Sequence, residues 1–197
     1  MLDIFNKFNF FVANIQHICS MSNNINLTNW QWLHQPASFE LTEATVSIHT
    51  NTKTDFWQRT YYGFRVNNAP ALLTETSEDF SFSVKAAFQY NKLYDQCGVL
   101  VYHDEENWFK ASIEFENASI SRLGSVVTNL GYSDWATTDI PTGLETIHFR
   151  LSRRGNDFLI EQSNDGITFK QMRIFHLHTI PKSIKVGVYA CSPVGPG

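Results

Sequence analysis

The stretch YDQCGVLVYHDEENWFKASIEFE, from Tyr94 to Glu116, predicts two β-strands joined by a tight acidic turn at residues 104–107. Residues 97–102 are nearly all apolar, which is typical of a central strand buried on both faces. Side chains alternate between the two faces of a strand, so the second strand has an apolar face and a polar face. The apolar face carries Phe109, Ala111, Ile113 and Phe115, and the other carries Trp108, Lys110, Ser112, Glu114 and Glu116. A Lys, two Glu and a Trp together on one face indicate a site covered by water or by a ligand.

The segments on either side of this hairpin predict further strands. Residues 80–90 alternate apolar and polar side chains, and Asp165-Gly166 lies between two β-prone runs, which is a strong hairpin signal. We expect another strand region after Ala118, broken at Gly124, and a polar loop over residues 131–139. Within residues 30–197 no apolar series keeps a helical period. The pattern predicts one all-β domain, a sandwich or jelly roll of about ten or more strands.

Composition limits the classes of partner. The chain has 197 residues, of which 43% are hydrophobic and 14% aromatic, enough for a substantial core. A net charge of −4 without a basic run argues against nucleic acid and anionic membranes as partners, and no apolar run approaches the length of a membrane span. Three irregularly spaced cysteines, Cys19, Cys97 and Cys191, indicate reduced thiols in a cytoplasmic protein. A bridge between Cys97 and Cys191 would require close Cα atoms.

The two ends of the chain differ from the strand pattern between them. Residues 1–27 are expected to be an N-terminal extension, since they make a poor signal peptide and Met21 opens a polar stretch typical of a protein start. The extension is either a mis-assigned upstream segment or a loosely attached, disordered one. Residues 28–197 are expected to form the single domain. Residues 191–197, at its end, have a composition typical of a loop. Either the domain lacks a closing C-terminal strand or the sequence is truncated.

Glu114 and Glu116 are the first candidate for chemistry. Carboxylates at i and i+2 on one strand face lie about 6.5–7 Å apart at Cα, which can bring the carboxyl groups to the separation used by retaining glycosidases. Jelly-roll glucanases carry a third acid two or three residues further on, where this chain has Ala118 and Ser119. The catalytic motif is incomplete, and the alternative is a solvated strand end. We therefore expect a binding protein rather than an enzyme.

Three other groups are candidate ligand-binding residues. Lys110 lies four residues before Glu114 on the face shared with Trp108, which offers an aromatic ring and charges suited to a sugar. Asp55, Trp57 and Arg59 share a face and either line a cleft or form a surface strand with a stacked Arg–Trp pair. Ser133, Asp134 and Trp135 lie in the expected loop, where the Trp side chain either binds a ligand or packs over the end of the sandwich.

Metal and cofactor chemistry have little support in the sequence. His176 and His178 share a strand face and could supply two ligands, but no third ligand is evident. The sequence has no Ser-His-Asp arrangement, no setting for a catalytic cysteine and no phosphate-binding glycine loop. We expect neither a metal nor a cofactor.

Five phrases together resemble a known family. They are TDFWQRTYYGF at 54–64, the opening stretch at 94–116, SVVTNLGYSDW at 125–135, SNDGITFKQMR at 163–173 and VGVYACSP at 186–193. In this order they are similar to a domain-of-unknown-function family of the concanavalin A-like lectin/glucanase superfamily, which includes the fungal regulation-of-enolase protein. The resemblance covers about residues 28–193.

The resemblance implies a two-sheet jelly roll with one concave sheet, whose concave face or rim binds carbohydrate in the wider superfamily. Carried over, the ligand-binding positions include Tyr94, Asp95 and Gln96 in addition to the groups named above. The resemblance assigns no reaction, and family members usually continue past the Ser-Pro motif into a last strand.

The sequence leaves three hypotheses of function. The first is a carbohydrate-binding or sugar-related accessory protein with its ligand site on the concave face. The second is a cytoplasmic regulatory protein that acts through a protein partner such as a glycolytic enzyme. The third is a glycoside hydrolase that uses Glu114 and Glu116. A ligand site would require Lys110 and Glu114 to line an enclosed pocket with Trp57, Gln96 and Trp135.

Overall fold

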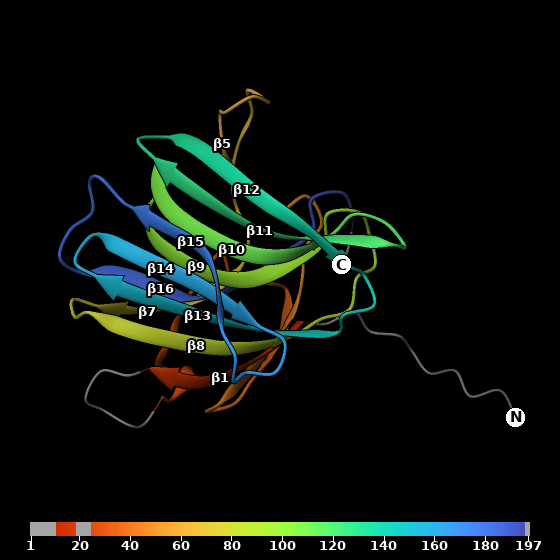
Figure 1. Ribbon diagram of the computed structural model, residues 1–197, viewed down its shortest axis with the longest axis horizontal. Helices are drawn as coiled ribbons and strands as arrows, with labels where there is room; N and C mark the ends of the chain where they lie inside the picture. The colour runs from red at the N-terminus through yellow and green to blue at the C-terminus, as the bar shows by residue number, and fades with distance from the viewer. Residues whose placement is uncertain (1–10, 19–24, 196–197) are drawn as a thin grey trace, which may run out of the picture.

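The computed structural model describes residues 11–18 and 25–195, and it shows the expected all-β, two-sheet jelly-roll sandwich. Two seven-stranded sheets lie face to face, and a short two-stranded hairpin is added to one of them (Figure 1). Besides strands, the described residues include one short 3₁₀ helix, η1, at Leu27–Asn29. Among these residues no helix is long and apolar enough to cross a membrane.

The first sheet has the strand order β15-β14-β13-β8-β1-β4-β3, with every neighbouring pair antiparallel. In that order its strands are Lys170–His176, Asp157–Ser163, Thr146–Arg154, Phe80–Ala87, Phe11–Ile18, Thr45–His49 and Ser38–Leu41.

The second sheet has the order β12-β11-β10-β9-β16-β7-β2 and is also antiparallel. In that order its strands are Tyr132–Pro141, Ile120–Asn129, Asn107–Phe115, Gln96–Asp104, Ile184–Cys191, Ala71–Thr76 and Gln31–Leu33. The hairpin predicted at 94–116 is therefore β9 and β10, at the middle of this sheet.

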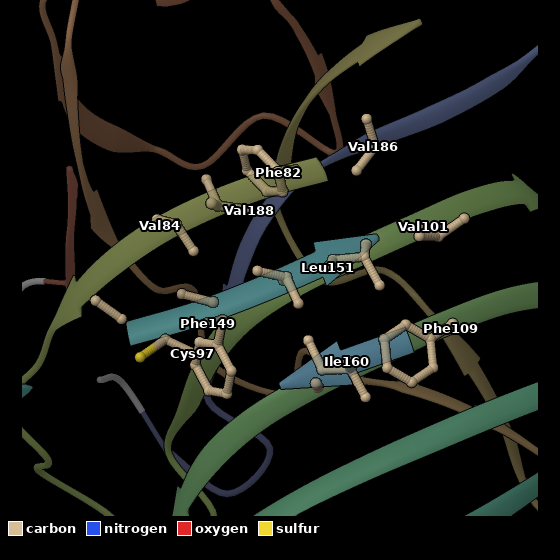
Figure 2. Close-up of a cluster of buried hydrophobic side chains, with 14 of the residues drawn as sticks. Phe82, Val84, Cys97, Val101, Phe109, Phe149, Leu151, Ile160, Val186 and Val188 are labelled. Atoms are coloured by element: carbon tan, nitrogen blue, oxygen red, sulfur yellow. The ribbon is translucent and has the colours of Figure 1, made fainter. Parts of the chain in front are cut away.

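The main hydrophobic core fills the space between the sheets (Figure 2). Phe82 and Phe149 of the first sheet and Val101 and Phe109 of the second all belong to this cluster, and all four side chains are buried. Phe109 also stacks on Phe175 of β15, with ring centroids 3.9 Å apart. Burial of apolar surface at about 25 cal/mol per Å² is the main force that holds the two sheets together.

The other face of the second sheet is partly covered by the hairpin of β5, Phe56–Gln58, and β6, Arg65–Asn67. Phe56 is fully buried and packs against Trp108 and Tyr189 of the sheet, with ring centroids 5.7 and 6.0 Å apart. This second, aromatic cluster covers only part of the sheet face, which leaves the neighbouring polar side chains of β9–β11 at the surface of a cavity.

Cys97 and Cys191 are free thiols that lie in different clusters on opposite faces of the second sheet. A disulfide between them is therefore excluded by the alternation of β9 and β16. Cys19 lies outside the described residues.

The N-terminal segment differs from the expectation of an extension outside the domain. Residues 11–18 form β1, which pairs with β4 on one side and with β8 on the other, in the interior of the first sheet. The prediction missed this strand because it placed the domain start after the polar stretch that begins at Met21. Residues 1–10 and 19–24, which complete the predicted extension, lie outside the described residues.

Two local predictions in the second sheet are wrong. Gly124 does not break a strand, since β11 runs without interruption from Ile120 to Asn129. Residues 131–139 are not a loop but most of β12, an edge strand paired along its length with β11. The strand was missed because its side chains are mostly exposed, so it carries no apolar alternation.

Candidate functional site

A cavity of about 500 Å³ opens on the outer face of the second sheet, beside the β5–β6 hairpin. Strands β9, β10 and β11 supply its floor, and aromatic side chains stand around it. Its lining consists of Asp55, Trp57, Tyr62, Phe64, Tyr94, Gln96, Lys110, Ser112, Glu114, Glu116, Arg122, Gly124, Val126, Trp135, Pro193 and Val194.

The floor follows directly from the strand pattern read in the sequence. Lys110, Ser112, Glu114 and Glu116 are every second residue of β10 and its end, so they share one face. The antiparallel register then places Glu114 between Gln96 on β9 and Arg122 on β11. Three polar side chains therefore lie side by side across the sheet, while their alternate neighbours fill the core.

Lys110 is held by an ion pair and an amide. Its Nζ donates to Asp55 Oδ1 at 2.7 Å and to Gln96 Oε1 at 3.1 Å. Burial alone would lower the pKa of Lys110, but the charge and hydrogen bond of Asp55, together with Cys191 and Glu114, outweigh it, and the pKa is raised. Lys110 is therefore a fixed cation, and one of its three N–H groups remains for a ligand.

Asp55 is oriented by the chain that surrounds it. Its Oδ1 accepts from the backbone N–H of Phe56 at 2.7 Å as well as from Lys110, and its own N–H donates to Asn68 Oδ1 at 3.0 Å. The contacts described for this carboxylate all go to Oδ1. Asp55 lines the cavity, so its carboxylate is an acceptor on the cavity wall.

Gln96 has one orientation that satisfies all its contacts. Its Oε1 accepts from both Lys110 Nζ and the Tyr189 hydroxyl, the latter at 2.9 Å. Its amide nitrogen must then face the other way, where it donates to Glu114 Oε2 at 2.8 Å. Gln96 therefore fixes the position of Glu114 through a hydrogen bond that a carboxylate or a carboxylic acid can accept.

Glu114 is an unusual acid. Burial raises its pKa from 4.5 to about 7, even though Lys110 acts in the opposite direction. At neutral pH the Glu114 carboxyl group is accordingly divided between its neutral and ionised forms. It can donate a hydrogen bond in the first form and accept one in the second.

The far side of the cavity is built by Arg122 and Trp135. The Arg122 guanidinium lies over the Trp135 ring, with its central carbon 5.6 Å from the ring centroid, and its Nε is 3.1 Å from Glu116 Oε2. A Cβ on Gly124 would lie 2.8 Å from Trp135 Nε1, so glycine at this position leaves room for the indole against the sheet. Gly124 thus has a packing role and no role as a strand break.

The near wall is the β5–β6 hairpin with Trp57, Tyr62 and Phe64. The indole Nε1 of Trp57 donates to the carbonyl of Thr60 at 3.2 Å, which ties the ring to the turn that follows. The hairpin is fastened to the sheet by Arg59, which donates to Gly131 O at 2.7 Å and to Glu106 Oε1 at 2.8 Å. The aromatic wall is therefore held in place before any ligand arrives.

Seven of the residues predicted to bind a ligand line this one cavity. They are Asp55, Trp57, Tyr94, Gln96, Lys110, Glu114 and Trp135. The five that a pocket would require, Lys110 and Glu114 with Trp57, Gln96 and Trp135, are all among them. The ion-pair partner of Lys110 is Asp55, with Nζ 2.7 Å from Oδ1.

Four predicted residues do not line the cavity. Trp108 is on the expected face but is fully buried under Phe56, and its Nε1 donates to Glu105 O at 3.1 Å. Arg59 fastens the hairpin, because its left-handed backbone (φ 58°) turns it away from the face of Asp55 and Trp57.

Ser133 is buried and accepts from the backbone N–H of Gln58 at 2.9 Å. Asp134 is paired with Arg173 at 2.8 Å outside the cavity. Trp108, Arg59 and Ser133 support the site structurally instead of meeting a ligand. Asp95, carried over with its neighbours, is buried, and its Oδ2 caps the turn at residues 91–92.

Some lining residues were missed. Arg122 could have been found by pairing strands, since a turn at 117–119 places it directly opposite Glu114. Tyr62 and Phe64 follow the left-handed residue Tyr61 and lie in or near a turn, where strand alternation gives no guide to direction. Pro193 and Val194 come from the C-terminal end, in a segment that carries no periodic signal.

The arrangement suits a hydroxyl-rich ligand with an apolar face. Fixed donors and acceptors line the floor, and aromatic rings form the walls. Within the part of the chain that the structure describes, no group of three or more His, Cys, Asp or Glu side chains is placed to hold a metal ion. His176 and His178 have ring centroids 5.2 Å apart, and His176 Nδ1 lies 2.7 Å from Asp157 Oδ1.

The chain is similar to known proteins of yeast. The chain is 34% identical over 172 residues to "Regulation of enolase protein 1" of Saccharomyces cerevisiae, which covers 87% of this chain and 85% of the relative. A crystal structure described as a functionally unknown protein from Saccharomyces cerevisiae superposes with a TM-score of 0.81 at 32% identity, covering 87% of this chain and 91% of that one.

More distant structures share the fold only. The GH43 BlXynB protein from Bacillus licheniformis matches with a TM-score of 0.65 at 14% identity, over 87% of this chain and 36% of that chain. The CBM2 module of the evolved Dit of Lactobacillus casei BL23 phage J-1 matches with a TM-score of 0.55 at 7% identity, over 94% of this chain and 91% of that chain.

A family model also matches residues 32–197, which include every residue that lines the cavity. Together with the relative in Saccharomyces cerevisiae, this match shows that the chain belongs to the family described as "Protein of unknown function (DUF1349)".

Proposed function

We propose that this protein binds a carbohydrate in the cavity on the outer face of its second sheet. The observation that carries the proposal is the hydrogen-bonded row of Asp55, Lys110, Gln96 and Glu114 between the aromatic walls of Trp57 and Trp135. A sugar presents hydroxyl groups around its edge and C–H groups on its faces. A polar floor between aromatic walls matches both features.

The row is built in advance of binding. Lys110, Gln96 and Tyr189 hold one another through hydrogen bonds of 2.9 to 3.1 Å, and Lys110 and Tyr189 are buried. Groups that are already ordered lose little conformational entropy when a ligand arrives. Lys110 offers a donor, Asp55 an acceptor, and Glu114 either one, which is the mixture that hydroxyl groups need.

A thermal-shift screen against neutral mono- and oligosaccharides tests the proposal. A bound sugar raises the midpoint of unfolding in proportion to its occupancy, because it binds the folded state only. Glu114→Ala and Trp135→Ala should lose this rise, whereas Asp139→Asn, at an exposed position on β12 outside the cavity, should keep it. If no class of sugar raises the unfolding midpoint of the wild type, the proposal is contradicted.

A second candidate is a regulatory protein that acts through a protein partner. It is supported by the relative named "Regulation of enolase protein 1", which is 34% identical over 87% of this chain. Purified enolase mixed with the full chain provides the test, by comigration in size-exclusion chromatography. Separate elution at concentrations well above the micromolar range would remove this candidate.

A glycoside hydrolase based on Glu114 and Glu116 has weaker support. Both side chains line the cavity and Glu114 has the raised pKa of a general acid, about 7. Glu116, however, lies against Arg122, and the third acid of the glucanase motif is absent at Ala118 and Ser119. Release of reducing sugar by the wild type and not by Glu114→Gln would support hydrolysis.

We also propose a cytoplasmic location, which is supported by the free thiols of Cys97 and Cys191. Fractionation of the source cells with antibodies against the chain would test it, and recovery in a secreted fraction would contradict it.

A further inference from the structure

The tip of the β5–β6 hairpin exposes aromatic rings beyond the edge of the cavity. The exposed fraction of the side chains increases outward, from 7% for Trp57 to 47% for Phe64, 54% for Tyr62 and 95% for Tyr61. Single exposed apolar residues are ordinary, but a continuous group of them indicates a binding surface.

The rings form a continuous series that begins in the cavity. Trp57 and Tyr62 have centroids 5.4 Å apart, Tyr62 and Phe64 5.8 Å, and Tyr62 and Tyr61 5.2 Å. Tyr62 and Phe64 are stacked, with an interplanar angle of 20°, and Tyr61 stands at 90° to Tyr62. These steps are comparable with the length of one pyranose unit in an extended glycan.

The hairpin that carries the rings is firmly positioned. Arg59 and Tyr61 both have left-handed backbones, with φ of 58° and 62°, a conformation that costs about 1–3 kcal/mol unless the surroundings impose it. The two left-handed conformations are imposed here by backbone hydrogen bonds from Gly63 N to Arg59 O at 2.7 Å and from Arg59 N to Phe64 O at 2.9 Å. Tyr61 is thus held outside the core by the shape of the turn.

From this series we infer that the cavity takes the end of a glycan chain, with the following sugar units lying on Tyr62 and Tyr61. The inference rests on the proposed carbohydrate function and adds a second, outer subsite to it. The occupant is a further sugar ring because the exposed rings continue the wall of a cavity that already suits a sugar. Stacking on neutral rings also favours an uncharged chain, since the outer rings add no charge of their own.

Titration calorimetry with xylo- and cello-oligosaccharides of one to four units tests the inference. Affinity should rise by roughly three- to tenfold between the single sugar and the trimer, the effect of one or two added ring contacts. Tyr61→Ala should remove the part of this gain that the outermost sugar unit contributes, and it should leave the affinity for the single sugar unchanged. The control is Ile167→Ala, an exposed apolar residue outside the cavity, which should change neither.

The outcomes separate the two proposals. If the wild type binds sugars with an affinity that does not depend on chain length, the outer subsite is wrong while carbohydrate binding stands. If Tyr61→Ala weakens the single sugar as much as the trimer, the outer subsite is also wrong. If no sugar binds at all, both proposals fail, and loss of enolase binding in Tyr61→Ala would then assign the aromatic tip to a protein partner.

Discussion

At the scale of single residues, the site depends on charges that are only partly covered. Lys110 is almost entirely buried, with 5% of its side chain exposed, while Asp55 retains 20%. A buried ion pair contributes little compared with an apolar pair, but a partner left alone is costly. The two residues are therefore expected to behave as a unit in mutagenesis.

Lys110→Met should lower the free energy of unfolding by about 2–4 kcal/mol, because it leaves Asp55 and the carbonyl of Gln96 without their shared donor. Urea denaturation of Lys110→Met, Asp55→Asn and the double variant measures the coupling. The double variant should lose less than the sum of the two single losses. Full additivity would contradict the pairing described here.

Glu114 should make stability fall as pH rises from about 4.5 to 7. The unfolded chain releases this proton near 4.5 and the folded chain near 7, so the folded state binds more protons in this window. The stabilising contribution is complete below the unfolded pKa and is lost as pH rises through the folded value. Its size is on the order of 3 kcal/mol.

Urea midpoints measured from pH 4 to pH 8 should therefore fall less in Glu114→Gln than in the wild type. The same variant should be more stable than the wild type at pH 8, since it carries no charge and its side chain can still accept from Gln96 Nε2. Because the Glu116 charge itself acts on Glu114, the matched control is Glu43→Gln, at an exposed position outside the cavity, which should retain the wild-type slope. Equal slopes for Glu114→Gln and the wild type would show that Glu114 titrates normally.

At the scale of elements, the first sheet depends on a strand from the start of the chain. β1 forms ladders with both β4 and β8, so its removal would leave two unpaired edges that face each other. Deleting residues 1–20 should lower the free energy of unfolding by several kcal/mol, whereas deleting only residues 1–10 leaves β1 in place and should cost much less. Thermal unfolding of both variants measures the difference, and equal midpoints would contradict the pairing of β1.

The elements also show which sequence signals suffice. Alternation located β8 and β10, because each has a face buried between the sheets, and a nearly continuous apolar run located β9. It failed for β12, an edge strand with a mostly polar, exposed sequence. An edge strand of this kind is recognisable only from its partner, β11, which it follows after a two-residue turn at Leu130 and Gly131.

At the scale of the whole molecule, the sequence could locate the strand face that carries the site, but not the hairpin that packs over that face. The polar face of β10 was visible from alternation, and Asp55, Trp57 and Trp135 were found as separate groups. The β5–β6 hairpin packs over part of this face, where it buries Trp108 and leaves Lys110 beside a cavity. This packing is tertiary structure, which the local sequence pattern does not reveal. Because of the same packing, Arg59 and Ser133, which were predicted to bind a ligand, instead form hydrogen bonds that hold the hairpin in place.

The most direct test of the account is the response of the five tryptophan indole N–H signals to a sugar. A nuclear magnetic resonance titration of the full chain with an oligosaccharide found in the thermal-shift screen would follow each signal, assigned by substitution. Binding in the cavity predicts that the signals of Trp57 and Trp135 shift in a saturable manner. The signals of Trp108, buried beneath Phe56, and of Trp30 and Trp32, which are partly buried against the core between the sheets, should not shift. Saturable binding that moves Trp30 or Trp32 and leaves Trp57 and Trp135 unchanged would place the ligand elsewhere and contradict it.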